Sequence, residues 1–280
     1  MMNIVHGRAL AKKMEESLKK ARAQFDFTPG LGIILIEGDA PSASYVERKV
    51  AKARELSMGA KVLRLSHAAT TEMVIEAVQE FAGDGDIDGI IVQLPLPPHI
   101  DRNKVLSAIP IEKDVDVLSP LARARFAHEE FPILPPIVSA VQYILEAYNV
   151  HTLGREVLVL GHGILVGAPL AQFMRQCGAR VTVVDQPVRD LKEFTKEAQI
   201  IICGTGVPNL LLPEHVSEGV VVIDAGMQRI DGKLVGDVHP DVALHAELFT
   251  PTPGGVGPLV VSALMKNVLI LARGRQHQTT

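Results

Sequence analysis

The stretch Val157-Leu-Val-Leu-Gly161-His162-Gly163-Ile-Leu-Val-Gly167 decides the fold of this chain. Its first four residues are apolar and predict a buried strand, and the residues after the turn predict a helix that ends near Gly178. Glycines at such a turn let the backbone approach a pyrophosphate, which the helix N-terminus holds through its free N–H groups. The spacing G-x-G-x-x-x-G is a variant of the usual fingerprint and is weak evidence alone. With its strand and helix, it predicts a dinucleotide-binding unit.

Asp185 strengthens this prediction. It ends a strand predicted over residues 180–184 and lies 24 positions after Gly161 (185 − 161). In dinucleotide-binding folds an acidic residue at this place accepts a hydrogen bond from the adenosine ribose 2′-hydroxyl. The structural alternative is that Asp185 only caps a loop.

Three further segments follow later strands or open the last helix. Strands are predicted over 198–203 and 220–223, followed by Gly204-Thr205-Gly206 and by Asp224-Ala-Gly226. Both segments are predicted to pass under the cofactor. The loop Pro251-Thr-Pro253-Gly254-Gly255-Val-Gly-Pro258 opens the final helix. It either lines the nicotinamide end or forms only a structural turn.

The first half of the chain shows the same alternation of strands and helices. Strands are predicted over 31–36, 61–65 and 89–94. A helix capped by Ser42 or Ser44 is predicted to run to Ser57 with Gly59 just beyond its end, and a second helix over 71–81. Repeated βα units indicate a parallel sheet. The segment 109–136 contains five prolines and predicts a long crossing connection of the kind that is usually functional.

The composition excludes several classes of protein. The chain has 280 residues, 47% of them hydrophobic but only 4% aromatic, so its cores must consist of Val, Ile, Leu and Ala. A net charge of -4 gives no basic surface for nucleic acid. Cys177 and Cys203 lack the spacing of metal ligands, so no metal is predicted. No signal peptide is recognised, and no apolar run reaches the ~20 residues of a membrane span. We therefore expect a soluble, cytoplasmic enzyme.

A second candidate site lies in the first half. Tyr45 and Lys49 are four residues apart and share one helix face, which alone would be an ordinary solvated face. Gln93 ends the third strand, at the edge where open α/β sheets bind ligands. The rigid segment Pro95-Leu-Pro-Pro98 stops the strand there. This combination predicts a lysine-centred pocket.

At these residues the chain resembles the bifunctional methylenetetrahydrofolate dehydrogenase/cyclohydrolase family, FolD. The matching segments recur in the family's order over nearly the whole chain: Ser44-Tyr-Val-x-x-Lys49, Val92-Gln-Leu-Pro-Leu-Pro97, Lys113-Asp-Val-Asp116, Gly161 with Val166-Gly167-x-Pro169, Gly232-Lys-Leu-Val-Gly-Asp-Val238 and Pro253-Gly-Gly-Val-Gly-Pro258. Together they are highly specific, because no single constraint of the fold demands all of them.

The resemblance implies a role for each matching residue. Lys49 is expected to be the general acid/base, Tyr45 to shape the pterin pocket and Gln93 to hold the lysine. Asp116 is expected to accept from the pterin N–H groups, and Pro253, Gly254 and Gly255 to line the substrate site. The implied reactions oxidise 5,10-methylenetetrahydrofolate with NAD(P) and hydrolyse the methenyl product to 10-formyltetrahydrofolate.

The chain also departs from the family's pattern. His162-Gly163 replaces an Arg-Ser pair that normally helps to grip the 2′-phosphate of NADP. With Asp185 added, the residues favour NAD, although the family's habit favours NADP. Arg189 is the side chain that we expect to offset part of the repulsion from a phosphate. Other departures are Val117 in place of glycine, Pro136-Ile-Val138 in place of Cys-Thr-Pro, and Val260 in place of threonine.

We therefore predict an α/β protein of two domains with the active site between them. An N-terminal three-layer α/β folate domain comprises residues 1–136 plus 258–280, to which the C-terminal helix returns. A Rossmann-type NAD(P)-binding domain comprises residues 137–257. The alternatives are a monofunctional NAD-dependent dehydrogenase on folate or a related pterin, and a non-catalytic dinucleotide-binding paralogue. Family members are usually homodimers, so we expect one here, with no nucleic acid and no membrane as partner.

Overall fold

The computed structural model describes residues 3–186 and 190–276, and the chain forms two compact units. Unit 1 comprises Met1–Lys12 and Ile137–Val260, and unit 2 comprises Lys13–Pro136 and Val261–Thr280. The main division falls between residues 136 and 137, and residues 3–12 group with unit 1. The assignment of a folate domain and an NAD(P)-binding domain to the predicted ranges stays a prediction.

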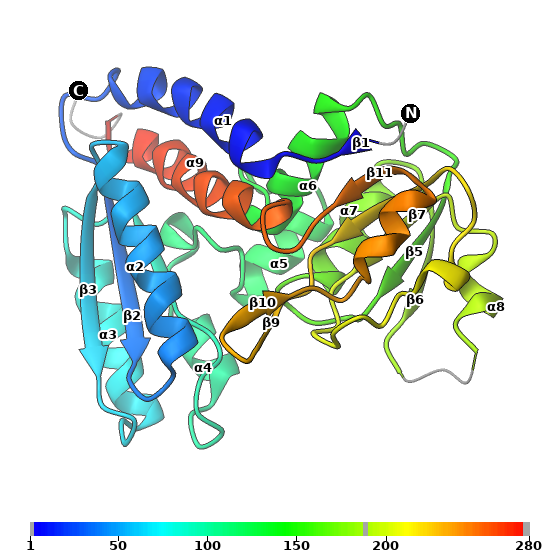
Figure 1. The fold of residues 1–280 in the computed structure, drawn as a ribbon. Coiled ribbons are helices and arrows are strands. Elements are labelled where there is room, and N and C mark those ends of the chain that lie inside the picture. Colours follow the sequence, from blue (N-terminus) through cyan, green and yellow to red (C-terminus); the bar gives the residue numbers. More distant parts are fainter. Residues whose placement is uncertain (1–2, 187–189, 277–280) are drawn as a thin grey trace. The chain divides into compact units, whose positions relative to one another are not determined.

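Unit 1 is built on a parallel sheet with the strand order β1-β11-β8-β7-β5-β6 (Figure 1). Its strands are β1 (Asn3–Ile4), β5 (Glu156–Leu160), β6 (Arg180–Val184), β7 (Ile200–Cys203), β8 (Val220–Asp224) and β11 (Ala246–Thr250). The sequence analysis missed β1 and β11. The pairing of β1 with β11 carries the N-terminal segment into unit 1, with Asn3 opposite Leu248.

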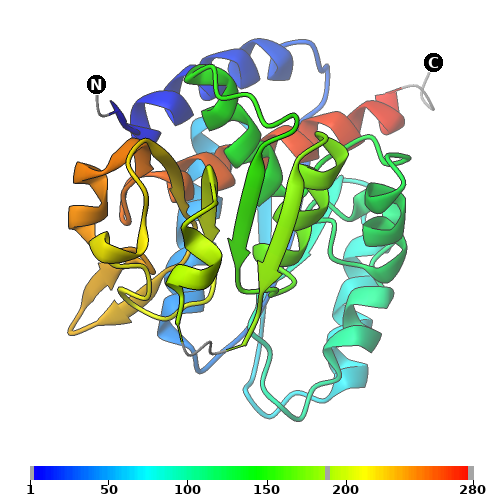
Figure 2. The same ribbon diagram turned by 90° about the vertical axis from the view of Figure 1, so that its right-hand side faces the viewer.

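The order of these strands creates a switch point. From β5 the chain passes to β6 on one side of β5 (Figure 2), and it then returns to β7 on the other side. Loops therefore diverge between the carboxyl ends of β5 and β7, which is where open α/β sheets bind ligands. The remaining elements of unit 1 are α6 (Pro136–Ala147), α7 (Gly167–Gln176), α8 (Lys192–Thr195), η2 (Pro213–His215), η3 (Pro240–Leu244) and the hairpin β9 (Gln228–Ile230) and β10 (Lys233–Val235).

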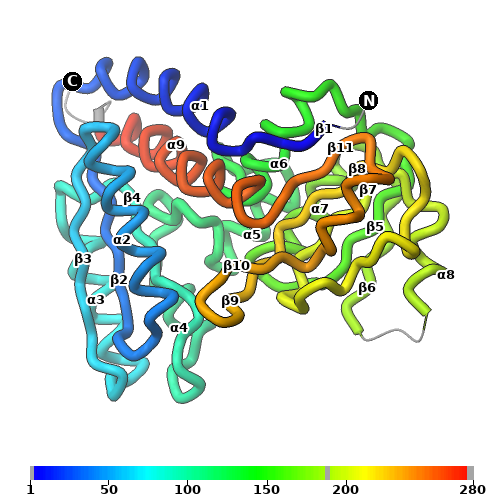
Figure 3. Tube along the Cα trace, viewed as in Figure 1, coloured from blue at the N-terminus to red at the C-terminus, as the bar shows by residue number. Residues whose placement is uncertain are grey.

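Unit 2 contains a parallel sheet with the order β3-β2-β4 (Figure 3). Its strands are β2 (Gly30–Ile36), β3 (Gly59–Leu65) and β4 (Gly89–Val92). Every residue of β2 is buried, as expected for the central strand of a covered parallel sheet. The helical elements are α1 (Gly7–Arg22), α2 (Ala40–Glu55), α3 (Thr71–Gly83), α4 (Arg102–Ser107), η1 (Ile111–Lys113), α5 (Pro120–Ala127) and α9 (Val256–Gln276), of which α1 and α9 begin in unit 1.

The ends of α2 differ from the prediction. Asp39, rather than Ser42 or Ser44, caps the helix by accepting from the Ser42 N–H at 2.9 Å. Asp39 is the cap because the helix then has Pro41 in its first turn, where the N–H that proline lacks would have no partner within the helix. At the other end Leu56 is the C-cap residue, and Gly59 is already the first residue of β3, paired with Gly30.

The segment 109–136 is also more ordered than predicted. Instead of one long irregular connection, it contains η1 and the helix α5, which Ser119 caps by accepting from the Ala122 N–H. Its prolines do not prevent the helix, because Pro120 lies at the first helical position, where a missing N–H costs nothing.

Helix α9 corrects the expectation that no segment could reach the length of a membrane span. Residues Val256–Arg275 are long and apolar enough to cross a membrane by length and composition alone. In the structure 56% of the most apolar part of this helix is buried in the protein. Such burial is typical of the core helix of a soluble protein.

Polar contacts fix α9 within unit 2. Asn267, which is 1% exposed, donates from Nδ2 to the carbonyl oxygens of Val115 at 2.9 Å and Leu134 at 2.8 Å. Ser262 donates to the buried Glu15 of α1 at 2.7 Å, which explains why the two helices run together in Figure 3. Buried polar groups destabilise a fold unless they are paired, so these contacts specify how the C-terminal helix packs on the first domain.

Val117 carries a strained backbone. Its φ of 57° lies in the left-handed region, which β-branched residues rarely adopt, and its side chain is only 1% exposed. The loop therefore keeps a conformation suited to glycine, while the valine side chain packs inside the protein.

We predict that Val117→Gly is more stable than Val117→Ala by about 1 kcal/mol, because alanine keeps the left-handed strain that glycine does not feel. Urea unfolding of both variants measures the difference. Ala124→Gly on the exposed face of α5 is the control, since there glycine should cost about 1 kcal/mol relative to alanine. An alanine variant as stable as the glycine variant at position 117 would show that the backbone is unstrained.

Candidate active site

The lysine of the predicted pocket in unit 2 lies on the inner face of α2. Ser42, Val46 and Ala53 form the buried face of this helix, and Lys49 falls on the same face at helical spacing. Lys49 is partly buried, so the apolar part of its side chain packs against the protein. Tyr45 lies one turn earlier and is also partly buried.

Gln93 meets Lys49 at the carboxyl edge of the sheet in unit 2. The Lys49 Nζ donates to the Gln93 Oε1 at 3.0 Å. The backbone of Gln93 is fixed because its N–H donates to the Ile34 carbonyl of β2 at 2.9 Å. Its side-chain amide donates to the Leu94 carbonyl at 2.7 Å, so the amide oxygen is aimed at the lysine. The predicted pairing of Lys49 with Gln93 is therefore present in the structure.

In the segment Lys113-Asp114-Val115-Asp116, Lys113 and Asp114 stabilise the fold, and Asp116 belongs to the candidate site. Lys113 donates to the carbonyl oxygens of Ala82 at 2.8 Å and Asp84 at 3.1 Å, and thus closes the end of α3. The fully buried Asp114 accepts from the backbone N–H groups of Leu118 and Ser119. These two roles, which the sequence analysis missed, hold the turn that presents Asp116.

Lys49 and Asp116 influence each other's ionisation. Burial lowers the pKa of Lys49 from its ordinary value, and the charge of Asp116 opposes this shift. Burial likewise raises the pKa of Asp116, and the charge of Lys49 opposes that shift while Asp114 adds to it. A lysine with a lowered pKa can exchange a proton nearer neutral pH than a solvated lysine can.

Tyr45 carries a further contact on α2. The guanidinium carbon of Arg48 lies 5.1 Å from the centroid of the Tyr45 ring, within the range of a cation–π interaction. The contact restrains the ring beside Lys49. That Tyr45 shapes a pterin pocket stays a prediction.

The glycine turn of unit 1 follows β5, at the switch point of the sheet. Gly161 has a φ of 90°, and a Cβ there would lie 2.7 Å from the Gly204 carbonyl oxygen. A Cβ at Gly167 would lie 2.0 Å from the Gly161 carbonyl oxygen, so only glycine allows α7 to start so close to the turn. At Gly163 a Cβ would meet open space, which leaves this face of the turn accessible. No side chain caps α7; the Ala168 N–H donates to the Gly163 carbonyl at 3.1 Å, and Pro169 has no N–H.

Asp185 joins this turn directly. Its Oδ1 accepts from the backbone N–H of His162 at 2.6 Å, and both residues are exposed. The carboxylate thus lies beside the glycine turn at the end of β6, as a ribose-binding acid requires. Arg189 lies outside the described residues.

The segment Gly204-Thr205-Gly206 packs against the same turn, and Asp237 holds it. Asp237 was quoted in the motif that ends at Val238, but the sequence analysis gave it no role. The sequence did indicate a possible role, because Asp237 lies between a glycine and a valine, directly before a stretch rich in turns.

Asp224 is 1% exposed, and its carboxylate accepts from the N–H groups of Gly226, Asp237 and Val238. A direct contact of this carboxylate with a cofactor stays a prediction, and its burial favours a supporting role.

Pro253, Gly254 and Gly255 belong to unit 1, before the start of α9. The Gly255 N–H donates to the Pro251 carbonyl at 2.7 Å, which closes the turn. Gly7 packs on this turn so closely that a Cβ there would lie 1.8 Å from the Gly255 oxygen. These contacts give the loop a structural function, and its contact with substrate stays a prediction.

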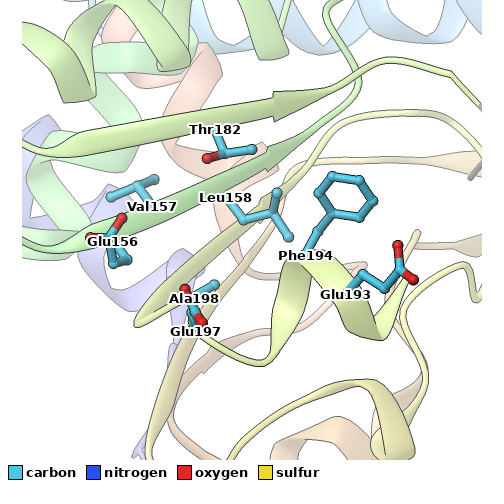
Figure 4. Close-up of a pocket in the computed structure, with 8 residues that line it drawn as sticks. All are labelled: Glu156, Val157, Leu158, Thr182, Glu193, Phe194, Glu197 and Ala198. Carbon is cyan, nitrogen blue, oxygen red and sulfur yellow. The ribbon is translucent and has the colours of Figure 1, made fainter. Parts of the chain in front are cut away.

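A hollow of about 140 Å³ lies elsewhere in unit 1 (Figure 4). Its full lining consists of Glu156, Val157, Leu158, Thr182, Glu193, Phe194, Glu197 and Ala198. The hollow contains none of the predicted site residues, so it is not the candidate active site.

Comparison with known proteins agrees with this geometry. The model of the tetrahydrofolate dehydrogenase/cyclohydrolase catalytic domain matches residues 5–116, and that of the NAD(P)-binding domain matches residues 135–276. A bifunctional protein FolD from Thermus thermophilus is 38% identical over 274 residues, which cover 98% of this chain and 97% of that protein.

Solved structures give the same result for the fold. The bifunctional FolD dehydrogenase/cyclohydrolase from Campylobacter jejuni superposes with a TM-score of 0.94 at 32% identity and covers 98% of this chain and 100% of that chain. The FolD of Trypanosoma brucei, solved with NADP cofactor and an inhibitor, has a TM-score of 0.92 at 33% identity and covers 98% and 99%. The chain therefore belongs to the tetrahydrofolate dehydrogenase/cyclohydrolase family.

Proposed function

We propose that the chain oxidises 5,10-methylenetetrahydrofolate to the 5,10-methenyl form with a nicotinamide dinucleotide, and hydrolyses that product to 10-formyltetrahydrofolate. The observation that carries this proposal is the hydrogen bond from Lys49 to Gln93, with Asp116 as the neighbouring charge. A non-catalytic dinucleotide-binding protein would have no use for such a lysine.

For the hydride that leaves the methylene bridge of the substrate, a bound nicotinamide dinucleotide would supply the acceptor. The residues that would hold it are the glycine turn from Gly161 to Gly167, the segment Gly204–Gly206 and Asp185. This chain's own contribution to that step is binding and orientation, because the folate nitrogens stabilise the cation that remains.

Lys49 contributes to the second reaction. Water adds to the methenyl carbon, a C–N bond of the ring opens, and one proton is released. The unprotonated form of Lys49 accepts the proton of the attacking water and returns it to the departing nitrogen. Gln93 holds the lysine in place, and Asp116 binds the N–H groups of the pterin.

We predict that Lys49→Met lowers the rate of methenyltetrahydrofolate hydrolysis by roughly 10²–10⁴-fold, the range that one general acid/base supplies. Dinucleotide binding should be unchanged, because the glycine turn lies in the other unit. Rates by absorbance and binding by calorimetry measure the two effects. Arg54→Met, an exposed position on the same helix, is the matched control. Wild-type hydrolysis by the Lys49 variant would remove the lysine from the mechanism.

The charge of Asp116 should set the pH at which Lys49 works. Because Asp116 raises the pKa of Lys49 against the effect of burial, Asp116→Asn should lower this pKa further. The unprotonated lysine would then be populated at lower pH, so the pH at which kcat for hydrolysis is half-maximal should fall. The KM for folate should rise as well. A profile of kcat against pH tests this, and a midpoint that stays in place or rises would contradict the coupling.

For the cofactor, we propose a preference for NAD over NADP. Asp185 supports it, because a carboxylate beside the glycine turn can accept from the ribose hydroxyls but repels a 2′-phosphate. A like-charge pair at ~4 Å costs between about 1 kcal/mol in water and about 4 kcal/mol near a protein surface. Asp185 is exposed, so solvent and salt bring the cost toward the lower figure.

We predict that kcat/KM is higher with NAD than with NADP, and that Asp185→Asn raises kcat/KM for NADP by roughly fivefold or more, as loss of about 1 kcal/mol of repulsion would. Steady-state kinetics with both cofactors measures this. Asp190→Asn removes a nearby exposed charge that does not contact the glycine turn, and it should change neither value. Higher efficiency of the wild type with NADP would reverse the proposal.

A further inference from the structure

One oxygen atom of Asp237 holds the segment Gly204–Gly206. The Asp237 residue is 1% exposed, and its Oδ2 accepts from the Thr205 N–H at 2.6 Å, the Thr205 hydroxyl at 2.8 Å and the Gly206 N–H at 3.1 Å. Hydrogen bonds to a charged acceptor are stronger than neutral ones, and here three donors converge on one carboxylate oxygen. Asp237 thus fixes both the backbone and the side chain of this segment.

The held segment lies directly against the glycine turn. The Gly204 N–H donates to the Leu160 carbonyl at 2.9 Å, next to Gly161. A Cβ at Gly161 would lie 2.7 Å from the Gly204 oxygen, and a Cβ at Gly204 would lie 2.4 Å from a methyl carbon of Val166. Neither segment can shift without moving the other. The contacts of Asp237 therefore reach the place where a dinucleotide binds.

Asp224 lies beside Asp237 in the same buried region. Its Oδ1 accepts from the Asp237 N–H at 3.2 Å. The two carboxylates are enclosed by glycines: a Cβ at Gly226 would lie 2.0 Å from the carboxyl carbon of Asp237, and one at Gly236 would lie 1.8 Å from an oxygen of Asp224. The other groups that face Asp224 are Cys203 of β7, the Thr250 hydroxyl of β11 and the Thr252 hydroxyl.

Two buried carboxylates without a cation cannot both stay ionised. Among residues 3–186 and 190–276, no Lys, Arg or His forms an ion pair with Asp224 or Asp237 within 4.0 Å. The three donors to Asp237 lie at 2.6, 2.8 and 3.1 Å, whereas the three N–H groups that donate to Asp224 lie at 3.2, 3.2 and 3.4 Å. The shorter hydrogen bonds favour the charge on Asp237, so Asp224 is the one that takes the proton. Burial, with the charge of Asp237, raises the pKa of Asp224 to about 7. The Oδ1 of Asp237 is buried and has no hydrogen-bond partner, so the region holds more acceptors than donors.

We propose that Asp237 is a positioning residue for the dinucleotide: its ionised carboxylate, beside a protonated Asp224, holds Gly204–Gly206 against the glycine turn in the binding-competent arrangement. The proposal rests on the dinucleotide binding of the proposed function. In this proposal Asp224 and Asp237 affect cofactor binding through the segment Gly204–Gly206 that they fix, and they do not contact the cofactor.

The first test removes the charge of Asp237 and keeps its shape. In Asp237→Asn a neutral oxygen faces the same three donors, so the loop is held less firmly, and the Kd for the preferred dinucleotide should rise roughly tenfold. Asp231→Asn, an exposed position in the β9–β10 turn, makes the same change of charge and should leave the Kd unchanged. Calorimetric titration measures both. A lower Tm with an unchanged Kd would make Asp237 merely structural and overturn the proposal.

The second test uses pH and is independent of whether the first variant folds. The raised pKa means that Asp224 stabilises the folded state fully below about pH 4 and loses this contribution as the pH rises to about 7. Above that pH a second buried charge repels Asp237, so the wild-type Kd should rise about threefold or more between pH 6 and pH 8. Asp224→Asn imitates the protonated form, so it should keep at pH 8 the Kd that the wild type has at pH 6.

The outcomes separate this proposal from the proposed function. A wild type that binds neither NAD nor NADP would defeat the proposed function itself. If the wild type binds a dinucleotide, but the Kd of Asp224→Asn changes with pH as steeply as the Kd of the wild type, only the positioning role is overturned. Hydrolysis of methenyltetrahydrofolate uses no dinucleotide, so its rate distinguishes a loss of cofactor binding from a loss of the fold.

Discussion

Parallel strand pairing is the constraint on which the rest of this structure depends. Along a parallel strand the backbone N–H and carbonyl groups are used by neighbouring strands, and side chains on both faces are buried. Polar chemistry is therefore confined to the ends of the strands. In unit 2 the chain leaves β2 for β3 on one side and returns to β4 on the other, and in unit 1 it does the same around β5. Gln93 lies directly after β4 and the glycine turn directly after β5, while Lys49 lies on α2, the helix that follows β2.

Burial of charge gives each unit a different electrostatic character. In unit 2 a lysine and an aspartate of opposite charge share a region where desolvation alone would neutralise both, so each partly preserves the other's ionised form. In unit 1 two aspartates of like charge share a region, so only one can be ionised near neutral pH. The first arrangement suits proton exchange with a substrate. The second suits a rigid hold on a loop.

Residues of one short motif can serve chemistry and architecture together. In the segment from Lys113 to Asp116, the lysine closes α3 and the first aspartate closes the following turn, while the charge of Asp116 acts on Lys49. Val117 continues this turn in a backbone conformation that glycine would adopt without strain. The departure from the family's glycine thus changes what fills the interior next to the site, and the path of the chain is kept.

The sequence by itself determined the α/β class, the strand and helix around the glycine turn, and the partnership of Lys49 with Gln93. These features follow from local periodicity, turn chemistry and the family's motifs, all of which are written in contiguous residues. Tertiary structure alone decided the pairing of β1 with β11 and the burial of Asp224 against Asp237. The reason is physical: β1 has two residues and no pattern of its own, and a carboxylate's role depends on which distant N–H groups reach it once the strands are paired.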